Sequence, residues 1–140
     1  MSNRDIGFYI VDIFIAIDKI YRYTNIFKNA DDLLHDELHW DATIRELEII
    51  GEATKNLLNE NLLNLKYRRI VDFRNQISHG YFGIDENIVW DIINNKLNLY
   101  EKDLRELVCL ESIDIITAIH SAKEEYRKND NILKLLTTLS

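Results

Sequence analysis

The chain has 140 residues, 46% apolar and 29% charged, with a formal net charge of −7. This length fits one domain with a substantial core, and the acidic balance excludes a protein whose whole surface attracts nucleic acid. Proline is absent and glycine occurs only four times, which favours long helices over a many-turned β architecture. A single cysteine, Cys109, excludes an intrachain disulfide framework.

No secretory signal pattern opens the sequence. The longest apolar stretch, from Phe8 to Ile17, is interrupted by Asp12 and is too short to span a membrane. We therefore expect a cytoplasmic protein with no membrane partner.

Isoleucines recur at intervals of four and three residues near the start of the chain. This period predicts a helix of about five turns from near Asp5 to near Ile26. A short helical turn that reaches Trp40 is expected next, with Asp31 as its N-cap. Asp41 is the expected N-cap of a second long helix.

A weaker apolar stripe predicts a third helix from about residue 61 or 62 to Ser78, which the Gly80–Gly83 segment breaks. Asp85 is the expected N-cap of a fourth helix, whose apolar residues continue to Leu107.

A fifth amphipathic helix is expected from about Ser112 to Tyr126, and a short last helix capped by Asp130. No linker or internal repeat divides the chain, so we expect a single domain over residues 1–140. The predicted class is all-α, with a four-helix bundle and additional C-terminal helices.

The segment from Arg74 to Tyr81 carries the clearest chemical signal, because it holds an arginine, a histidine and a tyrosine at the end of the third predicted helix. Histidine transfers protons near neutral pH, and the arginine fork binds phosphate oxygens. On a continuous helix, Arg74 and His79 would lie about 140° apart. They converge only if the helix ends near Ser78 or if two subunits bring two copies together.

A structural role would explain the same residues, with Arg74 paired to a carboxylate and His79 bonded to the last helical carbonyls. Asn75 could hold a ribose or backbone group. Three basic residues nearby are candidates for RNA contact in an otherwise acidic protein: Lys66, Arg68 and Arg69.

Together with an upstream block from Trp40 to Ala53, the segment resembles the HepT-like branch of the HEPN superfamily. The resemblance covers about residues 5–107 and leaves 111–140 as a helical extension. It implies a HEPN-type four-helix bundle that acts as the ribonuclease toxin of a type VII-like toxin–antitoxin pair. The implied partners are RNA (tRNA or mRNA, not DNA), a second copy of the chain, and an MNT-domain nucleotidyltransferase antitoxin.

The same resemblance implies roles for single residues. Arg74 stabilises the phosphate, His79 transfers protons and Asn75 assists, with no metal or other cofactor. In the homodimer, paired Arg-His sets face one cleft. Tyr81 is implied as the residue to which the antitoxin attaches AMP, although it could also be an aromatic lid beside the turn.

Two other functions fit a similar sequence. One is a non-enzymatic helical interaction subunit that binds a nucleotidyltransferase or a nucleotide. The other is a regulator that binds RNA without cutting it.

Two further patterns have both a structural and a functional explanation. His35 and His39 have the i,i+4 spacing of metal ligands on a helix, but Asp36 stands where a zinc-protease motif needs glutamate and no third ligand is evident, so a solvated helix face explains them better. Carboxylates of the second long helix could orient Arg74 or His79, or be solvated: Glu46, Glu48 and Glu52. Gly51 among them indicates a close helix crossing, which could lie at a subunit interface.

Overall fold

The protein is described here by a computed structural model that covers residues 2–79 and 83–140. Every regular element in these residues is helical, so the predicted all-α class is confirmed. The elements are α1 (Asn3–Thr24), α2 (Ala30–Leu34), α3 (Glu37–Asn59), the 3-10 turn η1 (Leu65–Tyr67), α4 (Arg68–Ser78), α5 (Glu86–Asp91), the π-helical turn η2 (Ile92–Lys96), α6 (Leu97–Leu110), α7 (Ile116–Glu125) and α8 (Asp130–Leu139).

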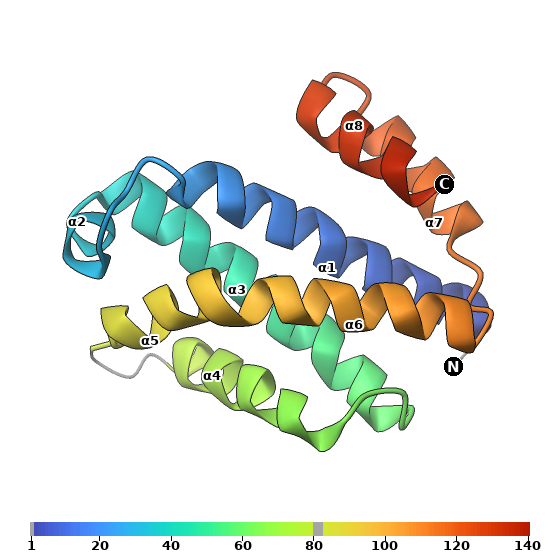
Figure 1. Ribbon diagram of the computed structural model, residues 1–140, viewed down its shortest axis with the longest axis horizontal. Coiled ribbons are helices and arrows are strands. Elements are labelled where there is room, and N and C mark those ends of the chain that lie inside the picture. The colour runs from blue at the N-terminus through green and yellow to red at the C-terminus, as the bar shows by residue number, and fades with distance from the viewer. Residues whose placement is uncertain (1, 80–82) are drawn as a thin grey trace.

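A bundle of α1, α3, α4 and α6 forms the body of the molecule, as predicted (Figure 1). Helix α1 packs along α3, α4 packs on the other side of α3, and α6 contacts α1. From Ile10 to Ile20 the isoleucine stripe of α1 is fully buried against apolar side chains of the other helices, and its removal from water stabilises the fold. The completely enclosed core side chains include Ile10, Ile13, Ile17, Ile20, Ile50, Leu57, Leu97 and Leu104.

Several predicted helix starts are wrong by a few residues, because a polar side chain earlier in the sequence caps the helix. Asp36, rather than Asp41, is the N-cap of α3, and its carboxylate accepts from the N–H of His39 at 3.1 Å. Asn29, rather than Asp31, caps α2. The predicted cap Asp85 is confirmed, since it accepts from the backbone N–H of Asn87.

The third predicted helix is shorter than expected, because η1 precedes it and α4 begins only at Arg68. Its predicted end at Ser78 is confirmed. The fourth predicted helix is one continuous rod made of α5, η2 and α6. Inside the rod, the N–H of Leu97 donates to the carbonyl of Ile92, five residues back.

The C-terminal helices form a hairpin that packs against α1 (Figure 1). Helix α7 begins at Ile116, later than predicted, and Asn129 rather than Asp130 caps α8, by accepting from the N–H of Ile132. Ile132 and Leu136 of α8 are fully buried. Residues 116–139 therefore belong to the packed structure and extend its core.

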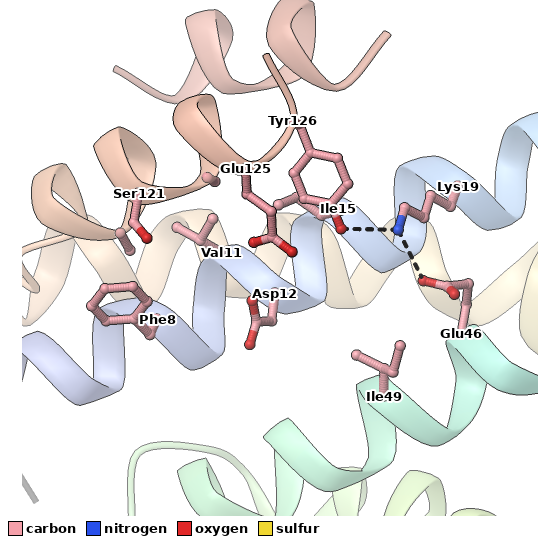
Figure 2. A pocket seen from close by; sticks show the side chains of 12 residues that line it. Phe8, Val11, Asp12, Ile15, Lys19, Glu46, Ile49, Ser121, Glu125 and Tyr126 are labelled. Atoms are coloured by element: carbon pink, nitrogen blue, oxygen red, sulfur yellow. Dashed lines mark hydrogen bonds and ion pairs between the residues drawn. The ribbon is translucent and has the colours of Figure 1, made fainter. Parts of the chain in front are cut away.

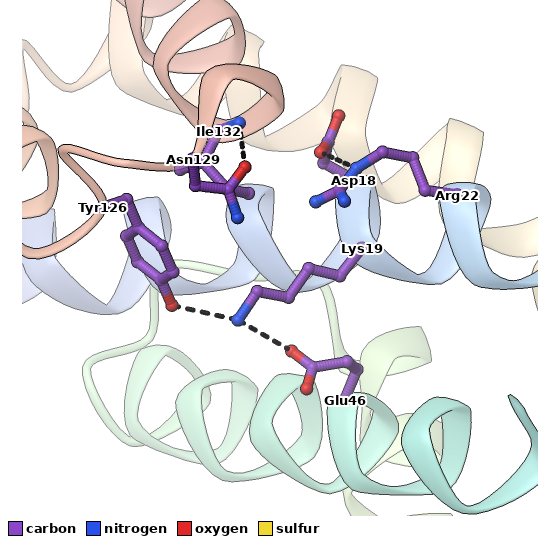
Figure 3. A network of polar contacts seen from close by, with 7 residues as sticks. All are labelled: Asp18, Lys19, Arg22, Glu46, Tyr126, Asn129 and Ile132. Carbon is purple, nitrogen blue, oxygen red and sulfur yellow. Dashed lines mark hydrogen bonds and ion pairs between the residues drawn. The ribbon is translucent and has the colours of Figure 1, made fainter. Parts of the chain in front are cut away.

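A polar network ties the hairpin to the bundle (Figure 3). The ammonium of Lys19 on α1 donates to the Tyr126 hydroxyl at 3.0 Å and lies 3.9 Å from a carboxylate oxygen of Glu46 on α3. Near the other end of α1, a Cβ added to Gly7 would lie 2.2 Å from the carbonyl oxygen of Asp114. The segment before α7 can therefore approach α1 this closely only at a glycine.

Candidate functional site

The candidate site lies on α4, at the place where this helix crosses α3. A Cβ added to Gly51 of α3 would lie 2.2 Å from the Cβ of Arg74 and 3.3 Å from the carbonyl oxygen of Ile70. The close crossing predicted from Gly51 is therefore present, and it lies within one chain. It presses the start of the Arg74 side chain against α3.

The guanidinium of Arg74 is held on two sides. Its Nη2 lies 2.7 Å from a carboxylate oxygen of Glu52 on α3, and its Nη1 donates to Asn75 Oδ1 at 3.2 Å. The Arg74 side chain remains 27% exposed, so it is oriented by these partners and still reachable from solvent.

Of the three carboxylates considered on α3, Glu52 is the one that contacts Arg74. Glu46 is buried on another side of α3 and faces Lys19 instead. Burial raises the pKa of Glu46, although Lys19 and then Arg45 oppose this rise. The two carboxylates are six residues apart on α3 and so point about 120° apart around the helix axis, and the packing of the helices decides which of these two faces meets α4.

His79 occupies the C-cap position directly after α4. Its backbone N–H donates to the carbonyl of Asn75 at 3.1 Å, and its Nδ1 lies 2.6 Å from the same oxygen. A carbonyl only accepts, so Nδ1 carries the proton in this contact. In the neutral ring the lone pair is then on Nε2.

Asn75 connects the other two residues. Its side chain accepts from Arg74 and its carbonyl accepts from His79. The structure thus brings Arg74, Asn75 and His79 together in one chain, because α4 ends at Ser78. An ordinary helix end would make the same kinds of contact, so the geometry fits both the catalytic and the structural role of these residues. Tyr81 lies outside the described residues.

The three basic candidates for RNA contact lie at the other end of α4. Arg68 and Arg69 are exposed in its first turn, about 15 Å along the helix axis from His79. Lys66 pairs with Asp103 of α6 at 3.4 Å. The structure therefore does not gather these three side chains around Arg74 and His79.

The prediction that His35 and His39 lie on one helix is wrong, because α2 ends and α3 begins between them. His35 ends α2, where its Nδ1 lies 2.8 Å from the carbonyl of Asp31. His39 lies in α3 and contacts the carboxylate of Asp36 at 2.7 Å. Within the described parts of the chain, no three His, Cys, Asp or Glu side chains are grouped so that they could hold a metal ion.

A cavity of about 230 Å³ lies between α1, α3 and α7 and contains none of the three motif residues (Figure 2). Asp12 of α1 and Glu125 of α7 both line it. Burial and then the charge of Glu125 raise the pKa of Asp12 to about 6, against the opposing effect of Lys19. In the sequence, Asp12 interrupts the apolar stretch from Phe8 to Ile17, and a carboxylate at such a position is itself a signal of an unusual environment.

No helix among residues 2–79 and 83–140 has both the length and the apolar character that crossing a membrane demands.

Comparisons with known proteins bear on the same region. A family model described as Ribonuclease HepT-like matches residues 13–108. A Methanocaldococcus jannaschii protein provisionally named an RNase is 34% identical over 112 residues, which cover 77% of this chain and 91% of the relative. A Thermococcus cleftensis protein provisionally named ribonuclease HepT is 34% identical over 99 residues, or 69% of this chain and 86% of the relative. No solved structure matches the chain.

Proposed function

The chain belongs to the HepT-like ribonuclease family of the HEPN superfamily, and from this premise we propose that it is a metal-independent endoribonuclease. Arg74, Asn75 and His79 form its reaction centre. The observation that supports this best is that Asn75 holds both of the other residues, through its side chain and its carbonyl.

In the proposed reaction, Nε2 of His79 removes the proton from a ribose 2′-hydroxyl. The 2′-oxygen attacks the adjacent phosphorus, and the bond from phosphorus to the 5′-oxygen breaks. A protonated histidine gives its proton to that leaving oxygen. The products are a 2′,3′-cyclic phosphate and a 5′-hydroxyl. Arg74 donates to the non-bridging phosphate oxygens, whose negative charge grows in the transition state.

The hydrogen bond from Nδ1 of His79 to the Asn75 carbonyl supports the assignment of the base, because it leaves the lone pair on Nε2. The ion pair with Glu52 supports the assignment of Arg74 as the phosphate-binding residue, because the pair orients the Arg74 guanidinium. One chain supplies one such histidine. We therefore propose a homodimer in which the His79 of each copy serves as base or acid across one cleft.

The first test uses purified protein whose intact mass shows no modification, labelled total RNA, and excess EDTA. We expect the wild type to produce fragments with cyclic phosphate ends. His79→Ala should lose at least about 100-fold of this rate, the low end for a general acid–base group. His120→Ala is the matched control, because His120 is an exposed histidine on α7, and it should cleave like the wild type.

Cleavage by His79→Ala at the wild-type rate would contradict the assignment of the base. No cleavage by any of the unmodified proteins would favour a non-enzymatic interaction subunit. Two contacts favour this second function: Arg74 pairs with Glu52, and His79 bonds the carbonyl of Asn75. Both contacts also occur at helix ends that have no catalytic role.

We further propose that the chain is the toxin of a type VII-like pair and that a nucleotidyltransferase antitoxin neutralises it by attaching AMP to Tyr81. Tyr81 follows His79 by two residues in the Arg-x4-His-x-Tyr motif. A phosphate attached there would repel the RNA backbone. Co-expression with the nucleotidyltransferase should add the mass of AMP to the wild type but not to Tyr81→Phe, and the modified wild type should no longer cleave RNA.

A further inference from the structure

A second pocket, of about 400 Å³, lies between the C-terminal end of α1 and the rod formed by α5, η2 and α6. Three aromatic rings and three carboxamides dominate its walls, and none of its lining side chains is charged. The lining residues are Tyr21, Thr24, Asn25, Phe27, Trp90, Ile93, Asn94 and Asn98. A pocket of this chemistry suits a flat, neutral ligand that has hydrogen-bonding groups on its edge.

The carboxamides can offer hydrogen bonds to such a ligand. The amide nitrogen of Asn94 donates to the carbonyl of Trp90 at 2.8 Å, which orients the side chain and leaves its oxygen as an acceptor. Among the described residues, no hydrogen-bond partner is found for the side chains of Asn25 and Asn98. Each carboxamide carries hydrogen-bond donors and an acceptor. The three side chains can therefore bond ligands whose edges differ in their arrangement of donors and acceptors.

The wall on the side of α5 and α6 contains the π-helical turn η2, which carries Ile93 and Asn94. Such turns are rare and occur frequently at functional sites. The turn interrupts the regular helical ladder directly beside the pocket.

The pocket lies at the same end of the molecule as His79. The C-terminal ends of α1 and α4 and the whole of α5 gather at this end (Figure 1). Helix α5 begins at Glu86, so even a fully extended connection would place its start within about 25 Å of His79. Trp90 lies about one turn further along α5, so a single strand bound at Arg74 and His79 can reach the pocket with a base a few nucleotides away.

We propose that this pocket binds one unstacked nucleobase of the RNA strand that Arg74 and His79 hold, an inference that rests on the proposed ribonuclease function. The base stacks on Trp90 or Phe27, and the carboxamides of Asn94 and Asn98 bond its edge. Proteins recognise single-stranded RNA in this way, by stacking on aromatic rings and by hydrogen bonds to base edges. The substrate class is thus single-stranded RNA, since a paired and stacked base cannot enter.

Trp90 provides the reporter for a direct test. The chain has two tryptophans, so Trp40→Phe leaves Trp90 alone, and His79→Ala in the same protein prevents cleavage. The probes are a short single-stranded oligoribonucleotide, the same strand with abasic positions, the same strand in a duplex, and free 5′-AMP and 5′-UMP. We expect the single strand to quench Trp90 fluorescence, and the abasic strand and the duplex to leave it unchanged.

Asn98→Ala should weaken binding of the single strand by about fivefold or more, since a carboxamide that bonds the base is lost. Asn95→Ala is the matched control, because Asn95 is exposed on the same rod, bonds Asp91 and does not line the pocket. It should bind like the parent protein. A Trp90→Phe variant that retains Trp40 should show no quenching.

Other outcomes separate this inference from the function on which it rests. Wild-type cleavage of RNA without quenching of Trp90 would overturn the base pocket and leave the ribonuclease function standing. Quenching by the single strand, with no cleavage by the wild type, would support base binding and contradict the ribonuclease. Free nucleotides could instead bind as tightly as the strand and lose the same binding affinity in Asn98→Ala. That result would contradict the proposal that the base belongs to an RNA strand.

Discussion

In two places a helix of this protein packs so closely against another segment that only a glycine fits, but the surroundings of these two contacts differ. At the crossing of α3 and α4, Gly51 faces the side chain of Arg74, and at the start of the C-terminal hairpin, Gly7 faces the backbone carbonyl of Asp114. In both places an added Cβ would approach a neighbouring atom to 2.2 Å. Close approach alone therefore does not distinguish the candidate site from a purely structural contact.

The charges beside the two contacts do distinguish them. Beside Gly51, the opposite charges of Arg74 and Glu52 pair at 2.7 Å. Along the contact of α1 and α7, the like charges of Asp12 and Glu125 line one cavity, and the pKa of Asp12 rises to about 6. The first contact holds a cation in a set direction, which suits phosphate binding. The second places a partly buried carboxyl beside another carboxylate, so we expect its contribution to stability to depend on pH.

The largest effect is expected from Gly51→Ala. The methyl group would overlap Arg74, and overpacking of this kind destabilises a protein by about 1–3 kcal/mol, which exceeds the gain of about 1 kcal/mol from helix propensity. Urea unfolding would measure the loss, with the exposed Lys55→Ala on the same helix as control. The rate of RNA cleavage should also fall, because the new methyl group would displace Arg74. A Gly51→Ala protein as stable and active as the wild type would show that the crossing is not tight.

A smaller and more local effect is expected from Gly7→Ala. The new methyl group would push the segment around Asp114 away from α1, so the hairpin should open more often while the α3–α4 crossing stays closed. Hydrogen exchange would show faster exchange in α7 and α8 and unchanged exchange in α4. Equal acceleration in both regions would mean that the two contacts unfold as one unit and would remove the distinction between them.

The pH dependence of the hairpin contact comes next in size. The pKa of Asp12 in the folded protein, about 6, lies above its ordinary value of 3.8. Asp12 therefore favours the folded state fully below pH 3.8, and this contribution is lost as the pH rises through 6. Thermal unfolding of the wild type minus that of Asp12→Asn, measured from pH 4 to 8, should show this decline. A difference that stays flat or rises over this range would contradict the burial of Asp12 beside Glu125.

The smallest change in stability is expected from Glu52→Gln. The Glu52 side chain is 50% exposed, and ion pairs exposed to this extent contribute about 1 kcal/mol or less. Cleavage should decrease several-fold, because Arg74 loses the partner that directs it. Glu48→Gln, a neighbouring carboxylate on α3, is the control. A Glu52→Gln protein with unchanged cleavage would show that the ion pair does not position Arg74.

Several parts of the fold were predictable because they depend on local contacts along the chain. The isoleucine spacing predicted α1, Asp85 was identified as a cap, and α4 ends at Ser78 as expected. The start of α3 was not predictable in this way. Asp36 and Asp41 are both good caps, and only the folded geometry shows that Asp36 accepts from His39.

By itself, then, the sequence determined the all-helical class, the family, and the choice of Arg74, Asn75 and His79 as candidates, because helical periodicity and a contiguous motif are written into neighbouring residues. Only the tertiary structure decided that Glu52 rather than Glu46 faces Arg74, and that Asn25, Trp90 and Asn98 share a pocket. These pairings join residues on different helices. They depend on how the helices cross, which is set by the packing of the whole core.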